Sequence, residues 1–384
     1  MRKYFNLLRN NFTLFPWLVI HQVKIWLPLD YFFSKSGYAY FPEQVTFIIT
    51  KRCNFGCEKC SSNSPQFTRE IAKSGMKADQ KELTTKEFKD IIDQLKHFGR
   101  PLIYFCGGEP TMRSDIFELI RYVKKQGMLT AMTTNGSLLN DRRIKELVES
   151  KLDFLSVSLD GPPEYHNRWR HFPQAFEKAT SAIAKIVAYK KKYQLTRPSV
   201  KIASIIDPLA VSNSYHILDT ASKLEINEVA FGNLMFYTPK LQQSQRNLKR
   251  KLGHVGEYMI GLEVPNDFEF DNPDTAGVEK LYQTAQAKYP NLNIIFNPPN
   301  LDARNYYNAK RYPKLSPCRS TYSTATISHT GDLYHCQENF IGNIRQKTFR
   351  KLWNDPKLKA FRSTRKKMQI PACYRCLEGQ ELKF

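Results

Sequence analysis

The chain has 384 residues and a formal net charge of +22, with 41% hydrophobic and 13% aromatic residues. This length suggests two domains and is ample for burying a core. The eight cysteines are too few and too dispersed for a small secreted disulfide framework, so that class is excluded. The excess of positive charge favours anionic partners such as RNA, phospholipid or acidic peptides, without choosing among them.

Residues 1–40 form a segment of their own, in which 14–33 is rich in aromatic and aliphatic side chains but interrupted by Lys24 and Asp30. Its apolar runs are too short to cross a membrane, and it lacks the cleavage site of a signal peptide. Basic residues precede Trp17 and Trp26, a makeup that suits a helix lying in a membrane interface. The alternative is a helix that packs on the rest of the protein or mediates a dimer.

Residues 41–240 alternate short apolar β-rich runs with amphipathic stretches, which predicts parallel βαβ units. The expected strands are 45–49, 102–105, 129–133, 154–158, 200–206 and 229–233. The expected helices are 85–98, 116–126, 142–150 and 175–191. Six such repeats predict an α/β fold, a partial (β/α)6 TIM-like barrel, whose active-site groups lie at the carboxyl ends of the strands.

The regularity fades after residue 240, where a polar, basic stretch begins. We expect a helical linker region over 241–312. Prolines at 298, 299 and 313 then mark breaks before a small cysteine-rich domain over 313–384.

Three cysteines with the spacing Cys53-x3-Cys57-x2-Cys60 follow the first predicted strand. Thiolates suit zinc or iron–sulfur clusters, and a [4Fe–4S] cluster normally takes one thiolate per iron. Three thiolates would leave one iron open to the amino and carboxylate groups of a small ligand. A zinc site with three thiolates is the alternative.

Small and polar residues follow the next strands. The turn Gly107-Gly108-Glu109-Pro110 lets backbone groups approach a ligand closely. Asn135 follows the third strand, and Ser156, Ser158 and Asp160 lie at the end of the fourth, where hydroxyls and amides can bind a ligand without filling its pocket. We expect Cys106, just before the turn, to be a buried strand residue rather than a cluster ligand.

The cysteine spacing followed by the Gly-Gly-Glu-Pro turn resembles the radical SAM superfamily. The resemblance implies that Cys53, Cys57 and Cys60 are catalytic and hold a [4Fe–4S] cluster that binds S-adenosylmethionine. It implies reductive cleavage to a 5′-deoxyadenosyl radical that abstracts hydrogen from a substrate. The cofactor-binding residues that it implies are Gly107, Gly108, Glu109, Asn135, Ser156, Ser158, Asp160 and Arg170.

Arg170 matches the family arginine that pairs with the carboxylate of S-adenosylmethionine, and Arg168 is the second choice. The chain departs from the family pattern at two positions. Lys59 stands where an aromatic residue usually precedes the third cysteine, and Asn167 stands where aspartate is usual. The first departure puts the adenine contact in doubt, and Phe55 is a weak replacement for it.

The tail holds a second set of four cysteines. Four thiolates suit zinc or a fully ligated [4Fe–4S] cluster. With Gly331, the turn at 342–344 and the Leu352-Trp353 pair, the spacing resembles the SPASM/twitch extension of radical SAM proteins in a shortened form. The resemblance implies one auxiliary [4Fe–4S] cluster, which aids electron transfer or anchors the substrate, held by Cys318, Cys336, Cys373 and Cys376.

These patterns favour a radical SAM oxidoreductase that modifies a peptide or small metabolite. The first alternative is an enzyme of the same family that acts on a lipid or lipid-linked substrate at the membrane surface. A non-enzymatic zinc-binding or nucleic-acid-binding protein is the alternative of another class. We expect a low-potential electron donor such as flavodoxin or ferredoxin, no nucleic-acid partner, and a cytoplasmic location with peripheral contact at the inner face of the membrane.

Overall fold

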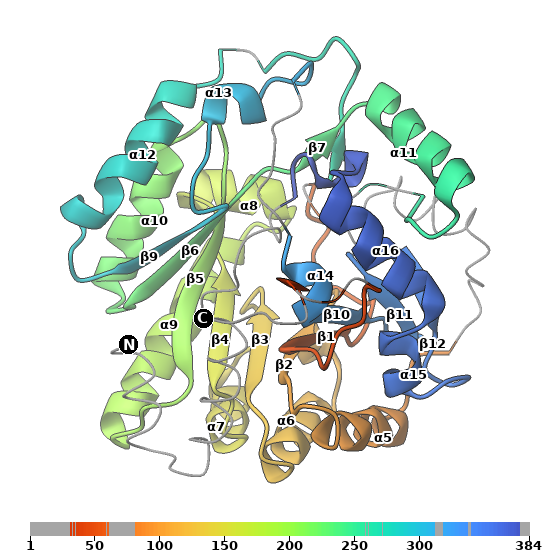
Figure 1. Ribbon diagram of the computed structural model, residues 1–384. Helices are drawn as coiled ribbons and strands as arrows, with labels where there is room; N and C mark the ends of the chain where they lie inside the picture. The colour runs from red at the N-terminus through yellow and green to blue at the C-terminus, as the bar shows by residue number, and fades with distance from the viewer. Residues whose placement is uncertain are drawn as a thin grey trace.

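The computed structural model describes residues 31–32, 34, 36–58, 60, 81–257, 259, 261–270, 272–311, 318–336 and 339–376. Most of these residues belong to one strongly curved α/β body with helices around a ten-stranded sheet (Figure 1). The predicted interfacial segment 14–33 lies outside the described residues except for Tyr31 and Phe32. Within the described part of the chain, no helix is long and apolar enough to cross a membrane.

The sheet has the order β12-β11-β10-β1-β2-β3-β4-β5-β6-β9. Its parallel strands from β1 to β9 are β1 (Gln44–Ile48), β2 (Leu102–Cys106), β3 (Thr130–Thr134), β4 (Phe154–Ser158), β5 (Ser199–Ile206), β6 (Glu228–Asn233) and β9 (Asn293–Asn297). All six predicted strands are confirmed, with ends that differ by one residue at most. Strand β9 was not expected and extends the parallel sheet from within the predicted linker region.

The tail continues the same sheet on its other side. Strand β10 (Thr324–Ile327) pairs in parallel with β1, and β11 (Asp332–His335) and β12 (Asn339–Asn343) follow it antiparallel. The sheet therefore runs across the boundaries expected near residues 240 and 312, and the division into four segments stays a prediction. A separate short sheet joins β7 (Phe236–Tyr237) and β8 (Leu262–Glu263).

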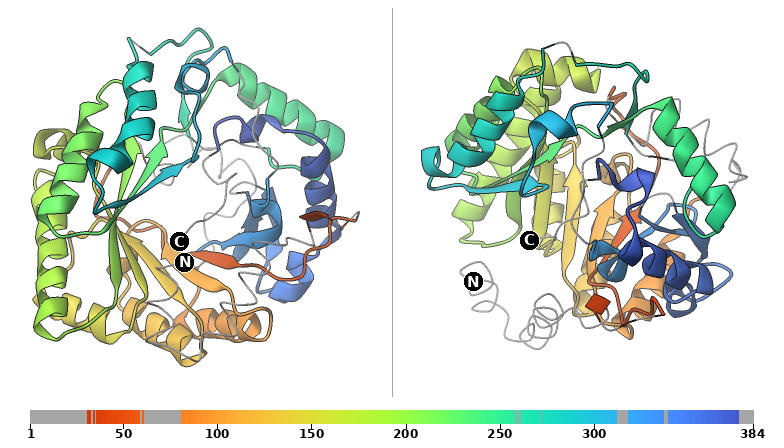
Figure 2. Two further views of the ribbon diagram at one scale, coloured as in Figure 1. Left: turned by 60° about the vertical axis from the view of Figure 1, so that its left-hand side comes forward. Right: turned by 45° about the horizontal axis from the view of Figure 1, so that its top comes forward.

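Helices cover the outer, convex side of the parallel strands, as the views in Figure 2 show. They are α5 (Thr85–Lys96), α6 (Ile116–Lys125), α7 (Asp141–Glu149), α9 (Ala175–Lys192), α10 (Ser212–Lys223) and α12 (Thr275–Lys288). The four predicted helices are confirmed, with ends that differ by two residues at most. The remaining helices are α8 (Pro163–Arg170), α11 (Pro239–Leu252), α13 (Ala303–Tyr306), α14 (Ser320–Ser323), α15 (Phe349–Trp353) and α16 (Pro356–Lys367).

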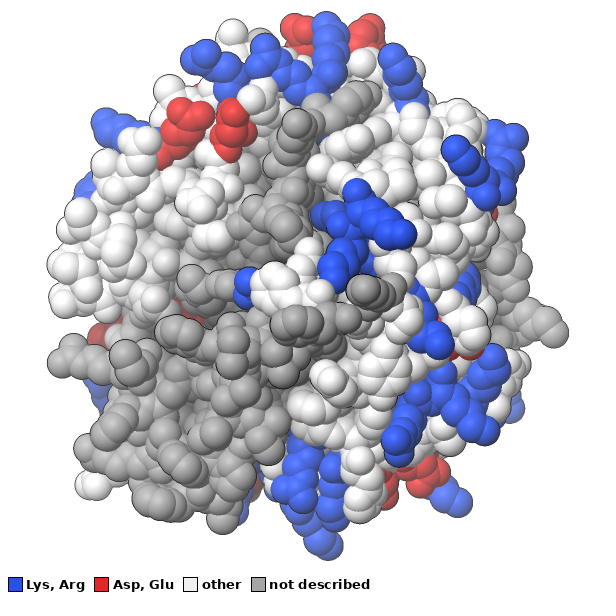
Figure 3. All heavy atoms as spheres, in the orientation of Figure 1, with Lys and Arg blue, Asp and Glu red and all other residues white. Residues whose placement is uncertain are grey.

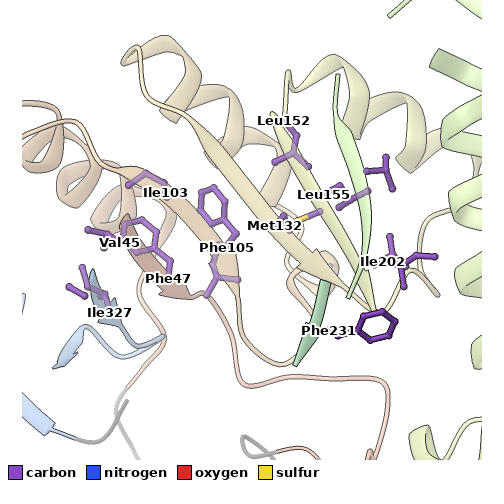
Figure 4. Packing of buried hydrophobic residues seen from close by; sticks show 14 of the residues in the cluster. Val45, Phe47, Ile103, Phe105, Met132, Leu152, Leu155, Ile202, Phe231 and Ile327 are labelled. Atoms are coloured by element: carbon purple, nitrogen blue, oxygen red, sulfur yellow. The ribbon is translucent and has the colours of Figure 1, made fainter. Parts of the chain in front are cut away.

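Apolar side chains of the strands form the core (Figure 4). Val45 and Phe47 of β1 lie beside Ile103 and Phe105 of β2, and all four are completely buried. Parallel strands with helices on one face bury long apolar runs, and each such side chain contributes about 1.5–3 kcal/mol on burial. This packing fixes the strand ends, where the polar residues of the predicted site begin.

A polar contact joins the tail to the barrel at α5. The helix begins with a capping box formed by Thr84 and Glu87, and the Glu87 carboxylate accepts a hydrogen bond from Arg345 Nε at 2.6 Å. The Arg345 guanidinium lowers the pKa of Glu87 to about 2. The first turn of α5 is thereby joined to the loop that follows β12.

Candidate active site and auxiliary metal centre

A cavity of about 220 Å³ opens at the carboxyl ends of β2 to β5. It brings together cysteines from the loop after β1 and small, polar or aromatic groups from the strand ends and α8. The residues that line it are Cys53, Phe55, Cys57, Cys60, Cys106, Gly107, Gly108, Glu109, Thr133, Thr134, Asn135, Ser158, Asp160, Tyr165, Trp169, Arg170 and Ile205.

The cysteine loop is held against α8 by its backbone. Glu58 N donates to the Trp169 carbonyl at 3.1 Å, and Cys60 N donates to the Cys57 carbonyl at 3.2 Å. Cys53 Sγ accepts a hydrogen bond from Phe55 N at 3.4 Å. The three sulfurs are free and face one cavity, so the donor set fits a cluster with three thiolate ligands.

The two glycines of the turn after β2 allow the cysteine loop to pack on it. Gly107 has φ +142°, and a Cβ there would lie 2.5 Å from the Thr50 carbonyl oxygen. A Cβ on Gly108 would lie 2.2 Å from the Arg52 carbonyl oxygen. The amides of Gly108 and Glu109 donate to these same two carbonyls at 2.8 Å. The turn therefore positions the residues that lead into Cys53.

Glu109 is 1% exposed, and its carboxylate joins β2 to β3. Oε1 accepts from Thr111 Oγ1 and Thr134 Oγ1, and Oε2 accepts from Asn135 N at 2.7 Å. The Asn135 side chain in turn donates to Asn54 Oδ1 at 3.0 Å. Glu109 and Asn135 both line the cavity, and the hydrogen bonds of their side chains hold its wall together.

Arg170 and Asp160 form an ion pair beside the cysteines. Asp160 Oδ2 accepts from Arg170 Nε at 3.0 Å and from Nη2 at 2.6 Å, while Nη1 lies 3.9 Å from Cys57 Sγ. Burial alone would raise the pKa of Asp160, but Arg170 holds this pKa below its ordinary value. Arg170 thus lies at the cavity, with its charge matched by Asp160. The alternative candidate, Arg168, stacks on Tyr165 and Trp169 and is absent from the cavity lining.

Two serines of β4 differ in position. Ser158 lines the cavity, whereas Ser156 is 3% exposed and does not line it. Both side chains point to the same face of the strand, but Ser156 lies two residues further from the carboxyl end. Its contact with the cofactor stays a prediction that the cavity lining does not support.

Some lining residues were not predicted from the sequence. Tyr165 and Ile205 line the cavity, and the Tyr165 hydroxyl donates to Asp207 Oδ2. Asp207 and Ile205 could have been found because they lie at the end of the predicted fifth strand.

Phe55 stacks on Phe172 with ring centroids 4.7 Å apart. Cys106 is only partly buried and lines the cavity, whereas we expected a buried strand residue.

Arg365 of α16 lies beside three of the tail cysteines. Its guanidinium interacts electrostatically with Cys373, Cys318 and Cys336. Cys376 N donates to the Cys373 carbonyl at 3.3 Å. Soft thiolates are a donor set that suits an iron–sulfur cluster. Among the described residues, no three His, Cys, Asp or Glu side chains are grouped as ligands of a single metal ion.

Two family models match the chain. The one described as the radical SAM superfamily matches residues 47–197, and SPASM, an iron–sulfur cluster-binding domain, matches residues 318–377. The chain therefore carries a radical SAM domain and a C-terminal SPASM domain. Such domains imply [4Fe–4S] clusters and S-adenosylmethionine as cofactors, and the cysteines Cys53, Cys57 and Cys60 at one cavity fit a cluster with three thiolate ligands.

Relatives of this chain cover different parts of it. Fe-coproporphyrin III synthase of Methanosarcina barkeri is 38% identical over 135 residues, 35% of this chain, and the chain covers 31% of that relative. A tungsten-containing aldehyde ferredoxin oxidoreductase cofactor-modifying protein of Pyrococcus furiosus is 23% identical over 337 residues, 85% of both chains.

Solved structures share the fold. Streptococcus suis SuiB bound to S-adenosylmethionine has a TM-score of 0.59 at 15% identity, covering 89% of this chain and 78% of SuiB. SuiB bound to its precursor peptide SuiA gives 0.58 at 14% identity, covering 90% and 78%. The partial barrel predicted from the sequence is therefore confirmed as the fold class.

Proposed function

We propose that this enzyme reductively cleaves S-adenosylmethionine and abstracts hydrogen from a peptide or small-molecule substrate. The observation that carries the proposal is the cavity at the strand ends, which is lined by three cysteines of one loop, Cys53, Cys57 and Cys60. When bound there, the cluster and S-adenosylmethionine would supply methionine and a 5′-deoxyadenosyl radical.

The chain's own groups have positioning roles in this proposal. Gly107 and Gly108 line the cavity and let the loop that leads into Cys53 pack closely on the turn. Asp160 and Arg170 present a fixed ion pair beside Cys57. The rings of Phe55, Tyr165 and Trp169 help exclude water, which protects a reactive radical from side reactions.

The substrate class is inferred from the relatives. One relative is named for a porphyrin product, one for modifying a cofactor, and SuiB binds a precursor peptide. We propose that the tail cluster aids the transfer of electrons during this reaction. A lipid or lipid-linked substrate stays the second candidate, and it rests on the aromatic and basic composition of residues 1–30.

A low-potential flavodoxin or ferredoxin is the proposed electron donor. Figure 3 shows Lys and Arg side chains gathered over the side that carries α11, α15 and α16, with few acidic side chains among them. Such a surface attracts a negatively charged partner and speeds its association. Cluster thiolates need a reducing environment, so we propose a cytoplasmic location.

The test is anaerobic reconstitution followed by iron, sulfide and product analysis. We expect about eight iron and eight sulfide per chain, as two [4Fe–4S] clusters require. Changing Cys53, Cys57 and Cys60 together to Ala should leave about four iron and abolish formation of 5′-deoxyadenosine. Stoichiometric zinc without labile sulfide would contradict the proposal.

A second variant separates the roles of the two centres. Changing Cys373 and Cys376 to Ala should spare some cleavage of S-adenosylmethionine, because the radical SAM cysteines are intact, but should block the substrate product. If this change abolished cleavage in a folded protein, the proposed division between the centres would be wrong.

A further inference from the structure

Arg365 on α16 is a buried cation surrounded by cysteines. The residue is 6% exposed, and the ionisable groups that act on its guanidinium include Cys373, Cys318 and Cys336, together with Tyr31. Within the described part of the chain it has no carboxylate partner. A buried charge is destabilising unless an opposite charge compensates it. We therefore expect an anion at the cysteines beside Arg365.

The guanidinium also has unused hydrogen-bonding capacity. Among the described residues, Arg365 Nε is buried without a hydrogen-bond partner, and Nη1 reaches only the Met368 carbonyl, at 3.5 Å. A buried donor left unsatisfied is destabilising. An acceptor at the cysteine centre would remove this destabilisation.

The other buried arginines of the tail have different surroundings, although, within the described part of the chain, each of them also has one buried nitrogen that makes no hydrogen bond. Arg362 donates to the Thr321 carbonyl at 2.7 Å and lies over the Trp353 ring, 4.3 Å from its centroid. Arg375 donates to the Tyr306 carbonyl at 2.9 Å and lies 4.1 Å from the centroid of Phe236. Burial alone therefore does not explain why Arg365 faces the thiols.

At the radical SAM centre, in contrast, the arginine beside the cysteines has a carboxylate partner. Arg170 approaches Cys57, but Asp160 already neutralises its charge through two hydrogen bonds. The buried Glu109 carboxylate adds negative charge near Cys53. The fixed charges of the chain therefore favour extra negative charge at the tail centre and oppose it at the barrel centre.

We propose that Arg365 is the charge partner of the auxiliary cluster and raises its reduction potential. The inference rests on the proposed presence of that cluster. A four-thiolate [4Fe–4S] cluster is anionic, and reduction adds one more negative charge. A neighbouring cation and hydrogen bonds to sulfur stabilise the reduced state and raise the potential. Arg365 is thus a positioning residue that biases the tail centre toward accepting an electron.

The test is a redox titration monitored by electron paramagnetic resonance on the full chain. The parent protein carries Cys53, Cys57 and Cys60 changed to Ala, so that only the tail cluster gives a signal. At the potential where half of the parent cluster is reduced, Arg365→Gln should lower the ratio of reduced to oxidised cluster at least tenfold. For one electron, this corresponds to a fall of 59 mV or more.

Two further variants show whether charge at this position is responsible. Arg365→Lys keeps the charge and should shift the potential less than Arg365→Gln. Lys367→Gln removes the same charge from an exposed position on the same helix and should leave the potential unchanged. An unchanged potential in Arg365→Gln, or an equal shift in Lys367→Gln, would overturn the inference.

Iron content decides the outcome if the glutamine variant does not hold its cluster. Loss of tail iron in Arg365→Gln with retention in Arg365→Lys supports the charge role, whereas loss in both shows a role in packing alone and overturns it. Failure of the proposed function itself is distinguishable, because the parent would then contain zinc or no labile sulfide before any titration.

Discussion

The carboxylate of Glu109 holds two strand ends of the cavity wall together. Glu109→Gln should lower the free energy of unfolding by about 1–3 kcal/mol, because the new NH2 group would face a backbone N–H donor, either that of Asn135 or that of Thr111, and leave it unsatisfied. Chemical denaturation of the reconstituted protein measures this loss.

Glu118→Gln is the matched control for that change. Glu118 forms an exposed ion pair with Lys89, and such pairs contribute about 0–1 kcal/mol. Equal losses in the two variants would show that the buried network around Glu109 is not special.

The buried His166 predicts a dependence of stability on pH. Burial lowers its pKa to about 4, from 6.5 in the unfolded chain, although the neighbouring Asp160 opposes this shift. The folded state therefore disfavours the proton. The stability that His166 contributes is complete above pH 6.5 and is lost as the pH falls from 6.5 toward 4.

Unfolding free energies at pH 7.5 and 5.5 test this expectation. The wild-type protein should lose about 1 kcal/mol from this residue between the two values, and His166→Asn should lack that part of the slope. Parallel pH profiles for the two proteins would show that His166 is not buried in the neutral form.

The position of a site residue could be predicted from the sequence where the strand end alone determines it, while the cofactor-binding roles stay predictions. Gly107, Glu109, Asn135 and Ser158 line the cavity as expected. Ser156 does not, because depth along a strand depends on the curvature of the whole sheet. The ion pair of Arg170 could also not be predicted from the sequence, since Asp160 and Arg170 meet only through the turn that places α8.

At the scale of elements, the turn after β2 is the feature most sensitive to a small change. Gly108→Ala would place a methyl group 2.2 Å from the Arg52 carbonyl oxygen, so the loop carrying Cys53 must move. We expect the radical SAM cluster to be lost while the tail cluster stays, leaving about four iron per chain.

Gly56→Ala, inside the cysteine loop, is the control for this prediction. Among the described residues, its Cβ would meet only His171 Cβ, at 3.9 Å, so about eight iron should remain. Retention of full iron in Gly108→Ala would show that the turn tolerates a side chain.

Elements with strong periodicity were predicted well, and the weaker ones were missed for physical reasons. Strand β5 alternates buried and partly buried residues along its whole length, which matches the pattern read from the sequence. Strand β9 is only partly buried and is flanked by asparagines. It forms because it pairs with the edge of β6, and no local sequence pattern indicates this pairing.

At the scale of the whole molecule, the N-terminal segment predicts binding to membranes. Tyr31 packs edge-on against Tyr322, and Lys366 Nζ donates to the Tyr31 carbonyl, so these contacts attach residue 31 to the tail domain. Deleting residues 1–30 leaves both contacts in place. The deletion should abolish salt-sensitive binding to anionic vesicles while both clusters are retained.

The strength of this binding to vesicles depends on the basic residues of the N-terminal segment. Each basic residue near anionic lipid contributes about 1 kcal/mol, so vesicles of neutral lipid should bind more weakly. Co-sedimentation measures the binding. If the intact protein ignored anionic vesicles, or if the deletion released iron, the segment would be structural and the lipid-substrate candidate would lose its support.

The pairing of β10 with β1 also affects how this protein could be divided or recombined. A chain cut before Cys318 would expose the edge of β1, whose Val45 and Phe47 are fully buried in the intact protein. Unpaired, apolar strand edges promote association with other chains. The SPASM domain therefore covers the β1 edge of the barrel. If this domain is exchanged between relatives, a first strand that pairs with the new β10 must be exchanged with it.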